Sequence, residues 1–329
     1  MKVLVTGGTG FIGSRLALRC LHDGDAVRVF GQANNTAEEK NQKLLASEGA
    51  ELIAASVADK SAVGKATDDV DIVFHLAAAQ HEANVPDKHF WDVNVEGTRN
   101  ILEASIVSGV KRFVHGSTIG VYGSAMDGEI DESTPLRPDN IYGVTKRKGE
   151  ELALSFVDKL PVSVVRISET YGPGDRRLLK LFRAIDKKVF FMIGSGENKH
   201  QLIYVEDLVD GLRLSASQEN AVGQMFVLAG HEIITTNQMA DAIASAVGAE
   251  RVRFRAPMWP FLMVAIMLEK VCRPFGVQPP LHRRRMDFFR KSFFFSVKRA
   301  ETLLGFQPMM SFHEGAKKTA KWYREYGLL

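Results

Sequence analysis

The sequence has only two cysteines, Cys20 and Cys272, and it has no Cys-x-x-Cys pair. Their scarcity excludes a disulfide framework and a cysteine zinc site, and it is typical of a reducing compartment. The apolar residues 3–5 lead straight into glycines, which predicts a strand there and not a signal peptide. We therefore expect a cytoplasmic protein.

Charge of one sign and long apolar runs are also lacking. The formal net charge is +3, which is too small to indicate a nucleic-acid partner. The longest apolar stretch covers residues 257–268, whereas a membrane-spanning helix needs about 20 residues. With 45% hydrophobic and 25% charged residues, the composition is that of an ordinary globular protein.

Short apolar runs alternate with helical patterns up to residue 170. The runs predict strands at residues 2–6, 26–30, 51–54, 72–76, 112–116 and 162–167, with helices at 10–22, 38–47, 61–66, 88–108 and 142–158. This order is typical of an α/β protein with a doubly wound, Rossmann-type parallel sheet. We predict a dinucleotide-binding domain over residues 1–170 and a strand near 224–228 that returns to its sheet. Residues 171–329 should form a smaller, mainly helical substrate lobe ending in a helix at 311–326.

A glycine-rich segment, TGGTGFIG, follows the first predicted strand at residues 6–13. Glycine allows a sharp turn from strand to helix, and without side chains a pyrophosphate can approach the backbone N–H groups. The position after a strand and before a helix is the context that this motif requires. Gly7, Gly10 and Gly13 are therefore predicted to bind a dinucleotide.

The residues after the second strand bear on the choice between NAD and NADP. An acid usually ends this strand when the ribose carries no phosphate, but Gly31 and Gln32 stand here. Gln32, Asn34 or Asn35 could bind a ribose hydroxyl or tolerate a 2′-phosphate. Because no arginine follows the strand directly, NAD is favoured and NADP stays possible.

Tyr142 and Lys146 are four residues apart and so lie on one face of the predicted helix. An ammonium near a phenol favours the phenolate and should lower the pKa of the tyrosine, which would make it usable as an acid and base. The strand at 112–116 runs into Ser117 and Thr118, whose hydroxyls could hold a substrate oxygen beside Tyr142.

Together these segments resemble the extended short-chain dehydrogenases/reductases, in the NAD-dependent epimerase/dehydratase group. The resemblance covers nearly the whole chain and rests on TGGTGFIG, FHLAA (74–78), NVEGT (94–98), STIGVYG (117–123), YGVTK (142–146), YGPGD (171–175) and IYVEDLV (203–209). It implies a catalytic set of Thr118, Tyr142 and Lys146. The cofactor contacts that it implies, besides the glycines, Gln32, Tyr142 and Lys146, are Phe11, Ile12, Ser56, Val57, Leu76, Ala77, Ala78, Asn94, Ile167 and Ser168.

Two departures from the family pattern concern the reaction and the substrate. Members that remove water carry Asp-Glu after the catalytic threonine, whereas Ile119 and Gly120 stand here, which argues against dehydration. Glu169 and His200 replace an Asn and an Arg that often contact the diphosphate of a nucleotide sugar. A carboxylate beside a diphosphate needs a compensating cation, which Arg176, Arg177 or the run 283–285 could supply. Glu169, Arg177, His200 and Arg285 are thus the predicted substrate-binding residues.

Three functions remain open from the sequence. The first is 4-epimerisation of a nucleotide sugar by reversible hydride transfer. The second is a single hydride transfer on a hydrophobic alcohol, because the second half resembles 3β-hydroxysteroid dehydrogenase-like members in its aromatic residues, Trp259, Phe261, Phe288 and 293–295. A simple lobe core explains the same aromatics. The third is a non-catalytic dinucleotide-binding module, against which the intact catalytic set speaks.

The remaining motifs predict less. His75, His81, Glu82 and His89 lack metalloprotease spacing, so no metal site is predicted, and His75 is expected to end a buried strand. The basic run 283–285, next to the apolar stretch 257–268, raises contact with a membrane surface as a further idea. Family members commonly dimerise through the helices that correspond to 88–108 and 142–158, so a homodimer is expected.

Overall fold

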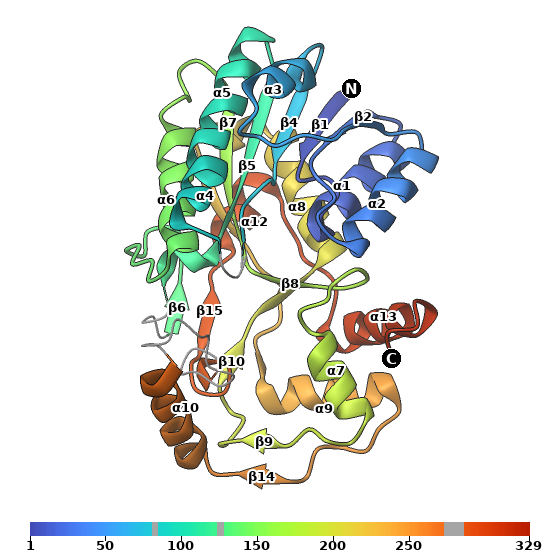
Figure 1. Cartoon of the computed structure of the whole chain (residues 1–329), viewed down its shortest axis with the longest axis vertical. Helices are drawn as coiled ribbons and strands as arrows, with labels where there is room; N and C mark the ends of the chain where they lie inside the picture. Colours follow the sequence, from blue (N-terminus) through green and yellow to red (C-terminus); the bar gives the residue numbers. More distant parts are fainter. Residues whose placement is uncertain (81–84, 124–127, 273–285) are drawn as a thin grey trace.

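The computed structural model describes residues 1–80, 85–123, 128–272 and 286–329 (Figure 1). Its centre is a seven-stranded sheet in which every pair of neighbours is parallel. The strand order is β12 (Met225–Leu228), β7 (Val162–Ile167), β5 (Arg112–Thr118), β4 (Ile72–His75), β1 (Lys2–Thr6), β2 (Ala26–Phe30) and β3 (Glu51–Ile53). The predicted Rossmann-type sheet and its returning strand are confirmed.

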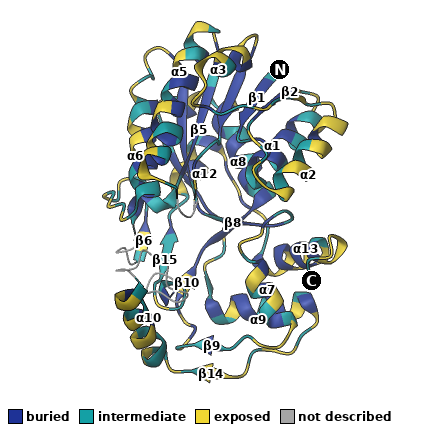
Figure 2. Ribbon diagram, viewed as in Figure 1, coloured by how far each residue is buried: buried dark blue, intermediate teal, exposed yellow. Residues whose placement is uncertain are grey.

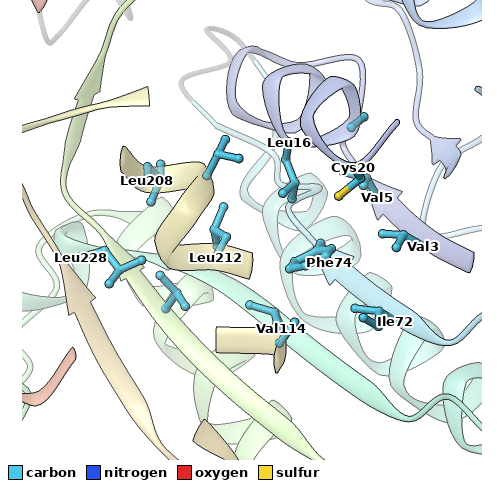
Figure 3. Packing of buried hydrophobic residues seen from close by; sticks show 14 of the residues in the cluster. Val3, Val5, Leu16, Cys20, Ile72, Phe74, Val114, Leu208, Leu212 and Leu228 are labelled. Carbon is cyan, nitrogen blue, oxygen red and sulfur yellow. The ribbon is translucent and has the colours of Figure 1, made fainter. Parts of the chain in front are cut away.

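Helices cover both faces of this sheet (Figure 1). One face carries α1 (Phe11–His22), α2 (Thr36–Ser47), α8 (Val205–Ser217) and α12 (Lys298–Leu304); the other carries α3 (Lys60–Thr67), α5 (Gly97–Val107) and α6 (Ile141–Leu154). Successive residues of β1 alternate between the two layers: Val3 and Val5 pack with Leu16 and Leu212, and Leu4 packs with the opposite cluster (Figure 3). The central residues of the strand, 3–5, are all apolar because both of its faces are buried.

The helix predicted at 88–108 is divided. It consists of α4 (Asp87–Trp91), a π-helical turn at Asp92–Glu96, and α5. Such turns are common at functional sites. Ile101 and Leu102 of α5 are fully buried against the sheet, so they are unavailable to the expected dimer interface. The homodimer stays a prediction.

The smaller lobe lies below the carboxyl edge of the sheet (Figure 1). Its core joins α7 (Leu179–Asp186), α9 (Thr236–Val247) and α13 (Phe312–Glu325), and α10 (Met258–Cys272) lies at its outer edge. Short strand pairs complete it: β8 (Glu169–Tyr171) with β11 (Leu202–Tyr204), β9 (Met192–Ile193) with β14 (Arg255–Ala256), β10 (Lys199–His200) with β13 (Ile234–Thr235), and β6 (Gly128–Ile130) with β15 (Phe293–Phe295). The lobe is therefore more mixed than the sequence predicted.

The chain crosses between the two parts more than once. Ala300 and Leu304 of α12, with Phe306, pack into the same cluster as β1 and α8. Most of the lobe follows residue 170, the predicted boundary, but β6 precedes it, and α8, β12 and α12 return to the sheet after it. These crossings connect the lobe to the sheet at several points of the chain.

Gly13 offers a test of the close packing at the first turn. A Cβ there would stand 2.3 Å from the carbonyl oxygen of Gly7, in a place where only backbone could move. We expect Gly13→Ala to lower the free energy of unfolding by about 2 kcal/mol. Gly64 lies in the exposed interior of α3, where a Cβ meets nothing within 4 Å. Gly64→Ala should therefore raise that free energy by about 0.5–1 kcal/mol. Urea unfolding of both variants checks this, and equal effects would contradict it.

Candidate active site

A cavity of about 1290 Å³ lies along the carboxyl edge of the sheet, between the glycine turn and the lobe. Ligand pockets usually measure about 300–1,000 Å³, so this cavity has room for more than one drug-sized ligand. It runs from Gly31 and Gln32, at the end of β2, past Tyr142 to Phe293 and Phe295 on β15. Open α/β sheets bind ligands at this edge, where the strand order reverses at β1.

The glycine turn forms a bare backbone cradle at one end of the cavity. Gly7 has a φ of +68°, and a Cβ on it would stand 2.7 Å from the backbone nitrogen of Ala77. No side chain caps α1 at Gly10, and the first N–H groups of a helix have no partner within it. These N–H groups and the helix dipole suit a pyrophosphate. The residues therefore fit the dinucleotide that the motif predicts.

The predicted cofactor residues gather around this cradle, with one exception. Those that line the cavity are Gly7, Gly10, Phe11, Ile12, Gly13, Gln32, Ser56, Val57, Leu76, Ala77, Ala78, Tyr142, Lys146, Ile167 and Ser168. Within the described part of the chain, the buried hydroxyl of Ser168 has no hydrogen-bond partner, which suits a polar ligand group at this point.

Asn94 is the exception. It is buried in the π-helical turn, behind the described cavity wall. Its side-chain oxygen accepts a hydrogen bond from the backbone N–H of Ala79 at 2.9 Å, and its amide donates to the hydroxyl of Thr145 at 3.0 Å. Asn94 therefore joins the loop after β4 to α6, which carries the predicted catalytic residues Tyr142 and Lys146. These contacts indicate a positioning role, and the cofactor contact of Asn94 stays a prediction.

Glu38, which the sequence prediction missed, stands near the adenine end of the cavity. Asn35 begins α2 by accepting hydrogen bonds from the N–H groups of Ala37 and Glu38. The Glu38 carboxylate accepts from the N–H of Asn34 at 2.7 Å and lines the cavity close to Gln32. An acid that is a candidate for the one sought at the end of β2 thus lies in the first turn of the next helix. We missed this acid in the sequence because we considered only the residues directly after the strand.

The three predicted catalytic residues lie together. Thr118 ends β5, and Tyr142 and Lys146 follow the start of α6, where the side chain of Asn140 accepts a hydrogen bond from the N–H of Gly143 at 3.0 Å. Thr118 and Tyr142 share a side-chain hydrogen bond. Lys146 donates from Nζ to the carbonyl oxygen of Gly116 at 2.6 Å. All three line the same stretch of the cavity.

The pKa values of Tyr142 and Lys146 differ from what the sequence led us to expect. Burial raises the pKa of Tyr142 to about 12, although the Thr118 hydrogen bond and the charge of Arg177 oppose this. Burial lowers the pKa of Lys146 to about 8, with Glu150 acting in the other direction. The predicted lowering of the tyrosine pKa by Lys146 is therefore wrong for the protein alone. The ammonium is directed at Gly116, and desolvation of the phenol dominates.

A buried ionic network underlies this group, and the sequence analysis missed it. Glu150 follows Lys146 by one turn of α6 and receives hydrogen bonds from Ser117 at 2.5 Å and from Arg166 Nη2 at 2.8 Å. Both charged side chains are only 2% exposed. Arg166 also donates to the hydroxyl of Tyr122 at 2.8 Å, and Tyr122 donates to the carbonyl of Asp131. The sequence did contain an indication of Glu150, because Tyr142, Lys146 and Glu150 follow one another at intervals of four residues and so lie on one face of the helix.

The predicted substrate residues lie at the lobe end of the cavity. Glu169, Arg177 and His200 line it, whereas Arg285 is outside the described residues. Nε2 of His200 lies 3.0 Å from the Thr236 hydroxyl and 2.9 Å from the Asn198 amide, so this nitrogen serves the lobe. Arg177 donates to the carbonyl of Thr170 at 2.8 Å and is half exposed.

The predicted aromatic cluster divides into three parts. Phe288, Phe293 and Phe295 line the cavity. Phe261 packs on Phe191 with ring centroids 5.8 Å apart. Trp259 is exposed on α10. The cavity therefore has an apolar wall beside its polar residues.

His75 ends β4 as predicted. It is fully buried, with its Nδ1 2.8 Å from the Thr6 hydroxyl and its Nε2 3.0 Å from the Thr98 hydroxyl. Of the residues that we weighed with it as a metal cluster, His81 and Glu82 are outside the described residues.

The family model of the NAD-dependent epimerase/dehydratase family matches residues 3–229, which is more than half of the chain. The chain belongs to this family. It is 29% identical to a 3β-hydroxysteroid dehydrogenase/decarboxylase, isoform 2, of Arabidopsis thaliana, over 96% of this chain and 61% of that protein. It is 28% identical to a dTDP-glucose 4,6-dehydratase of Streptomyces niveus, over 99% and 93% of the two chains. The chain spans only about three fifths of the plant relative's length.

Solved structures show the same fold. A UDP-glucuronic acid 4-epimerase of Bacillus cereus, crystallised with NAD, superposes with a TM-score of 0.79 over 99% of both chains at 22% identity. Members of the epimerase/dehydratase family thus include sugar-nucleotide epimerases and dehydratases. The presence of a dehydratase among the relatives means that the comparisons do not support our exclusion of dehydration.

The acidity of Lys146 gives a test of the buried network. We expect turnover at saturating substrate to fall as pH rises through about 8, because Lys146 then loses its proton. The negative charge of Glu150 raises the pKa of Lys146, so Glu150→Gln should move this alkaline limb to lower pH. Glu151→Gln, an exposed neighbour on the same helix, is the matched control and should leave the limb in place. An identical profile for wild type and Glu150→Gln would exclude this coupling.

Proposed function

We propose that this protein is an NAD-dependent oxidoreductase that transfers a hydride reversibly at a secondary alcohol of a nucleotide sugar, with epimerisation at carbon 4. The observation that carries the proposal is the contact of Thr118 with Tyr142 on the wall of a cavity that also contains the glycine cradle. A dinucleotide held at Gly7 and Gly13 would extend along this cavity toward Tyr142. Family membership supports the cofactor and the reaction class.

The residues suggest a division of labour in the reaction. When bound, NAD supplies the hydride acceptor and donor, and its oxidised ring adds a positive charge to the site. As the phenolate, which the added positive charge would favour, Tyr142 would take the proton from the substrate hydroxyl and, as the phenol, later return it, while Thr118 holds the Tyr142 oxygen and the substrate oxygen in line. The Lys146 ammonium stabilises negative charge that develops on the phenol, and Glu150 keeps this ammonium protonated near neutral pH.

Epimerisation also requires space in the site. The keto-sugar intermediate must rotate in the cavity before hydride returns to its other face. The volume of about 1290 Å³ supports this, since it exceeds the range of ordinary ligand pockets. Arg176 and Arg177 at the cavity wall are the described cations that could meet a diphosphate. We further propose that dehydration is disfavoured, because Ile119 and Gly120 supply neither an acid nor a base after Thr118.

Tyr142→Phe tests the catalytic assignment. Removing the hydroxyl removes the proton carrier, so we expect turnover to fall about 1,000-fold while the affinity for NAD changes little. Tyr326→Phe, at an exposed tyrosine near the end of the chain, is the control and should behave as wild type. Initial rates and cofactor titration measure the two effects. A fully active Tyr142→Phe enzyme would overturn the mechanism.

Glu38 provides a test of cofactor choice. Its carboxylate at the adenine end should repel a 2′-phosphate, so wild type should turn over faster with NADH than with NADPH. Glu38→Gln should reduce that preference about tenfold by removing the repulsion. Glu39→Gln, one residue further and exposed, should leave the preference unchanged. A strong preference of wild type for NADPH would contradict the choice of NAD.

A second candidate function is hydride transfer on a hydrophobic alcohol. It is supported by the apolar wall of Phe288, Phe293 and Phe295 and by the 3β-hydroxysteroid dehydrogenase/decarboxylase among the relatives. The two candidates differ in their need for added cofactor. An epimerase returns the hydride and often retains its NAD, whereas a dehydrogenase accumulates reduced nicotinamide.

Native mass measurement of co-purified ligand, followed by assays with UDP-glucose and UDP-glucuronic acid, separates the two functions. Interconversion of a nucleotide sugar without net change in reduced nicotinamide supports the first function. Net reduction of NAD by a sterol alcohol, without any reaction of either nucleotide sugar, would replace it with the second.

A further inference from the structure

The helix α10 is apolar and yet lies at the surface of the lobe. Trp259, Met263, Met267 and Val271 are 70%, 61%, 64% and 55% exposed. They follow one another at intervals of four, so they form one stripe along the helix. Ala265 and Glu269, on the opposite side, are buried. We call this stripe the α10 outer face, and it lies on the outer edge of the lobe in Figure 2.

The concentration of exposed apolar side chains here is unusual for the molecule. Phe254, shortly before the helix, and Val264, beside the stripe, are also exposed. Other large apolar residues that are exposed, such as Val107 and Met309, stand apart from this helix in the sequence. Contiguous apolar surface of this kind marks an interaction site, because leaving it in water is unfavourable.

The exposed charges nearest the stripe are basic. From residue 253 to the end of the helix the exposed charged side chains are Arg253, Arg255 and Lys270. Before this stretch, Glu250 is an exposed acid and Arg251 is paired with Asp241 at 3.8 Å. The acid of this stretch, Glu269, is turned inward and buried. An apolar stripe with a basic rim complements a surface that is apolar within and negative at its edge, as an anionic bilayer is.

We propose that the α10 outer face docks on the surface of an anionic lipid bilayer, with the helix lying in the plane of the membrane. Its 15 residues make it about 22 Å long, and among the described helices none is long and apolar enough to cross a membrane. Trp259 suits the interface, where a ring with one polar edge is stable. Docking would direct the lobe, and not the glycine cradle, toward the membrane.

A second copy of the chain fits this face less well. In a two-fold dimer the same patch meets itself, which would bring Arg253 and Lys270 close to the basic rim of the partner. Like charges placed together oppose association. A negatively charged lipid surface meets the same cations favourably, and about fivefold in affinity is expected from each cation at the membrane.

Vesicle sedimentation with the full chain tests the proposal. Wild type should bind vesicles of phosphatidylcholine with about one-quarter phosphatidylserine, bind pure phosphatidylcholine far more weakly, and be released by added salt. Met263→Gln/Met267→Gln keeps helix propensity, because Met and Gln are similar in this respect. It should weaken binding about tenfold or more by removing apolar burial. Arg253→Gln/Lys270→Gln should weaken binding through charge alone and reduce its salt dependence.

The matched control is Val107→Gln/Met309→Gln, which changes two exposed apolar residues elsewhere, 89% and 76% exposed. It should bind as wild type does. Failure of wild type to bind either vesicle would overturn the proposal, and so would equal binding by the α10 variant and the control. If wild type self-associates in solution and only the α10 methionine variant is monomeric, the face is instead a contact between copies and the lipid proposal is wrong.

Discussion

The buried ion pair of Glu150 and Arg166 fixes the helix that carries the chemistry. Arg166 lies on β7, the neighbour of the edge strand β12, and Glu150 lies on α6, so the pair attaches that helix to the strand beneath it. Such a pair contributes little net stability compared with apolar residues, but removal of one partner costs about 3–5 kcal/mol because a charge is then left buried. Ser117 and Tyr122 complete its hydrogen bonds. Helix, strand and the β5 end are thereby held in one arrangement.

That arrangement has a chemical consequence one turn away. Lys146 is buried among the same elements, and burial alone would remove its proton more readily. The carboxylate of Glu150 opposes this, so one acid serves both to bind Arg166 and to favour the charged lysine. Tyr142 and Thr118 then meet at the cavity wall because α6 and β5 have been set relative to one another. The relative positions of Thr118, Tyr142 and Lys146 therefore depend on the ion pair of Glu150 and Arg166.

The opposite end of the cavity depends on an absence of side chains. Gly7 and Gly13 bring backbone against backbone, and any Cβ there would collide with atoms that cannot move. The bare turn and the polar wall near Glu38 suit a dinucleotide, whereas the lobe end combines Glu169, His200 and Arg177 with three phenylalanines. A nucleotide sugar and a hydrophobic alcohol each match part of that lining. The two candidate substrates thus differ in which residues at the lobe end they would contact, and not in their use of the glycine turn.

Much of the sheet and part of the site were accessible from the sequence, since both depend on local pattern. Each strand of the sheet is a short apolar run, and the glycine turn and the Tyr142–Lys146 spacing are fixed within a few residues of chain. Contacts between distant segments were not accessible. Asn94 contacts Ala79 and Thr145, which are distant in the sequence, and Glu38 of the next helix lines the cavity near the end of β2.

The raised pKa of Tyr142 illustrates the same limit. The spacing of Tyr142 and Lys146 predicted that they share a helix face. It did not predict that the Lys146 ammonium donates to the carbonyl of Gly116, or that burial has the largest effect on the pKa of Tyr142. The exposure of α10 is similar, because an apolar run has the same sequence whether it is covered or not. By itself the sequence determined the fold class, the glycine turn and the residues Thr118, Tyr142 and Lys146 that we propose as catalytic. Only the tertiary structure decided acidity, positioning and surface, because these depend on what the folded chain removes from water.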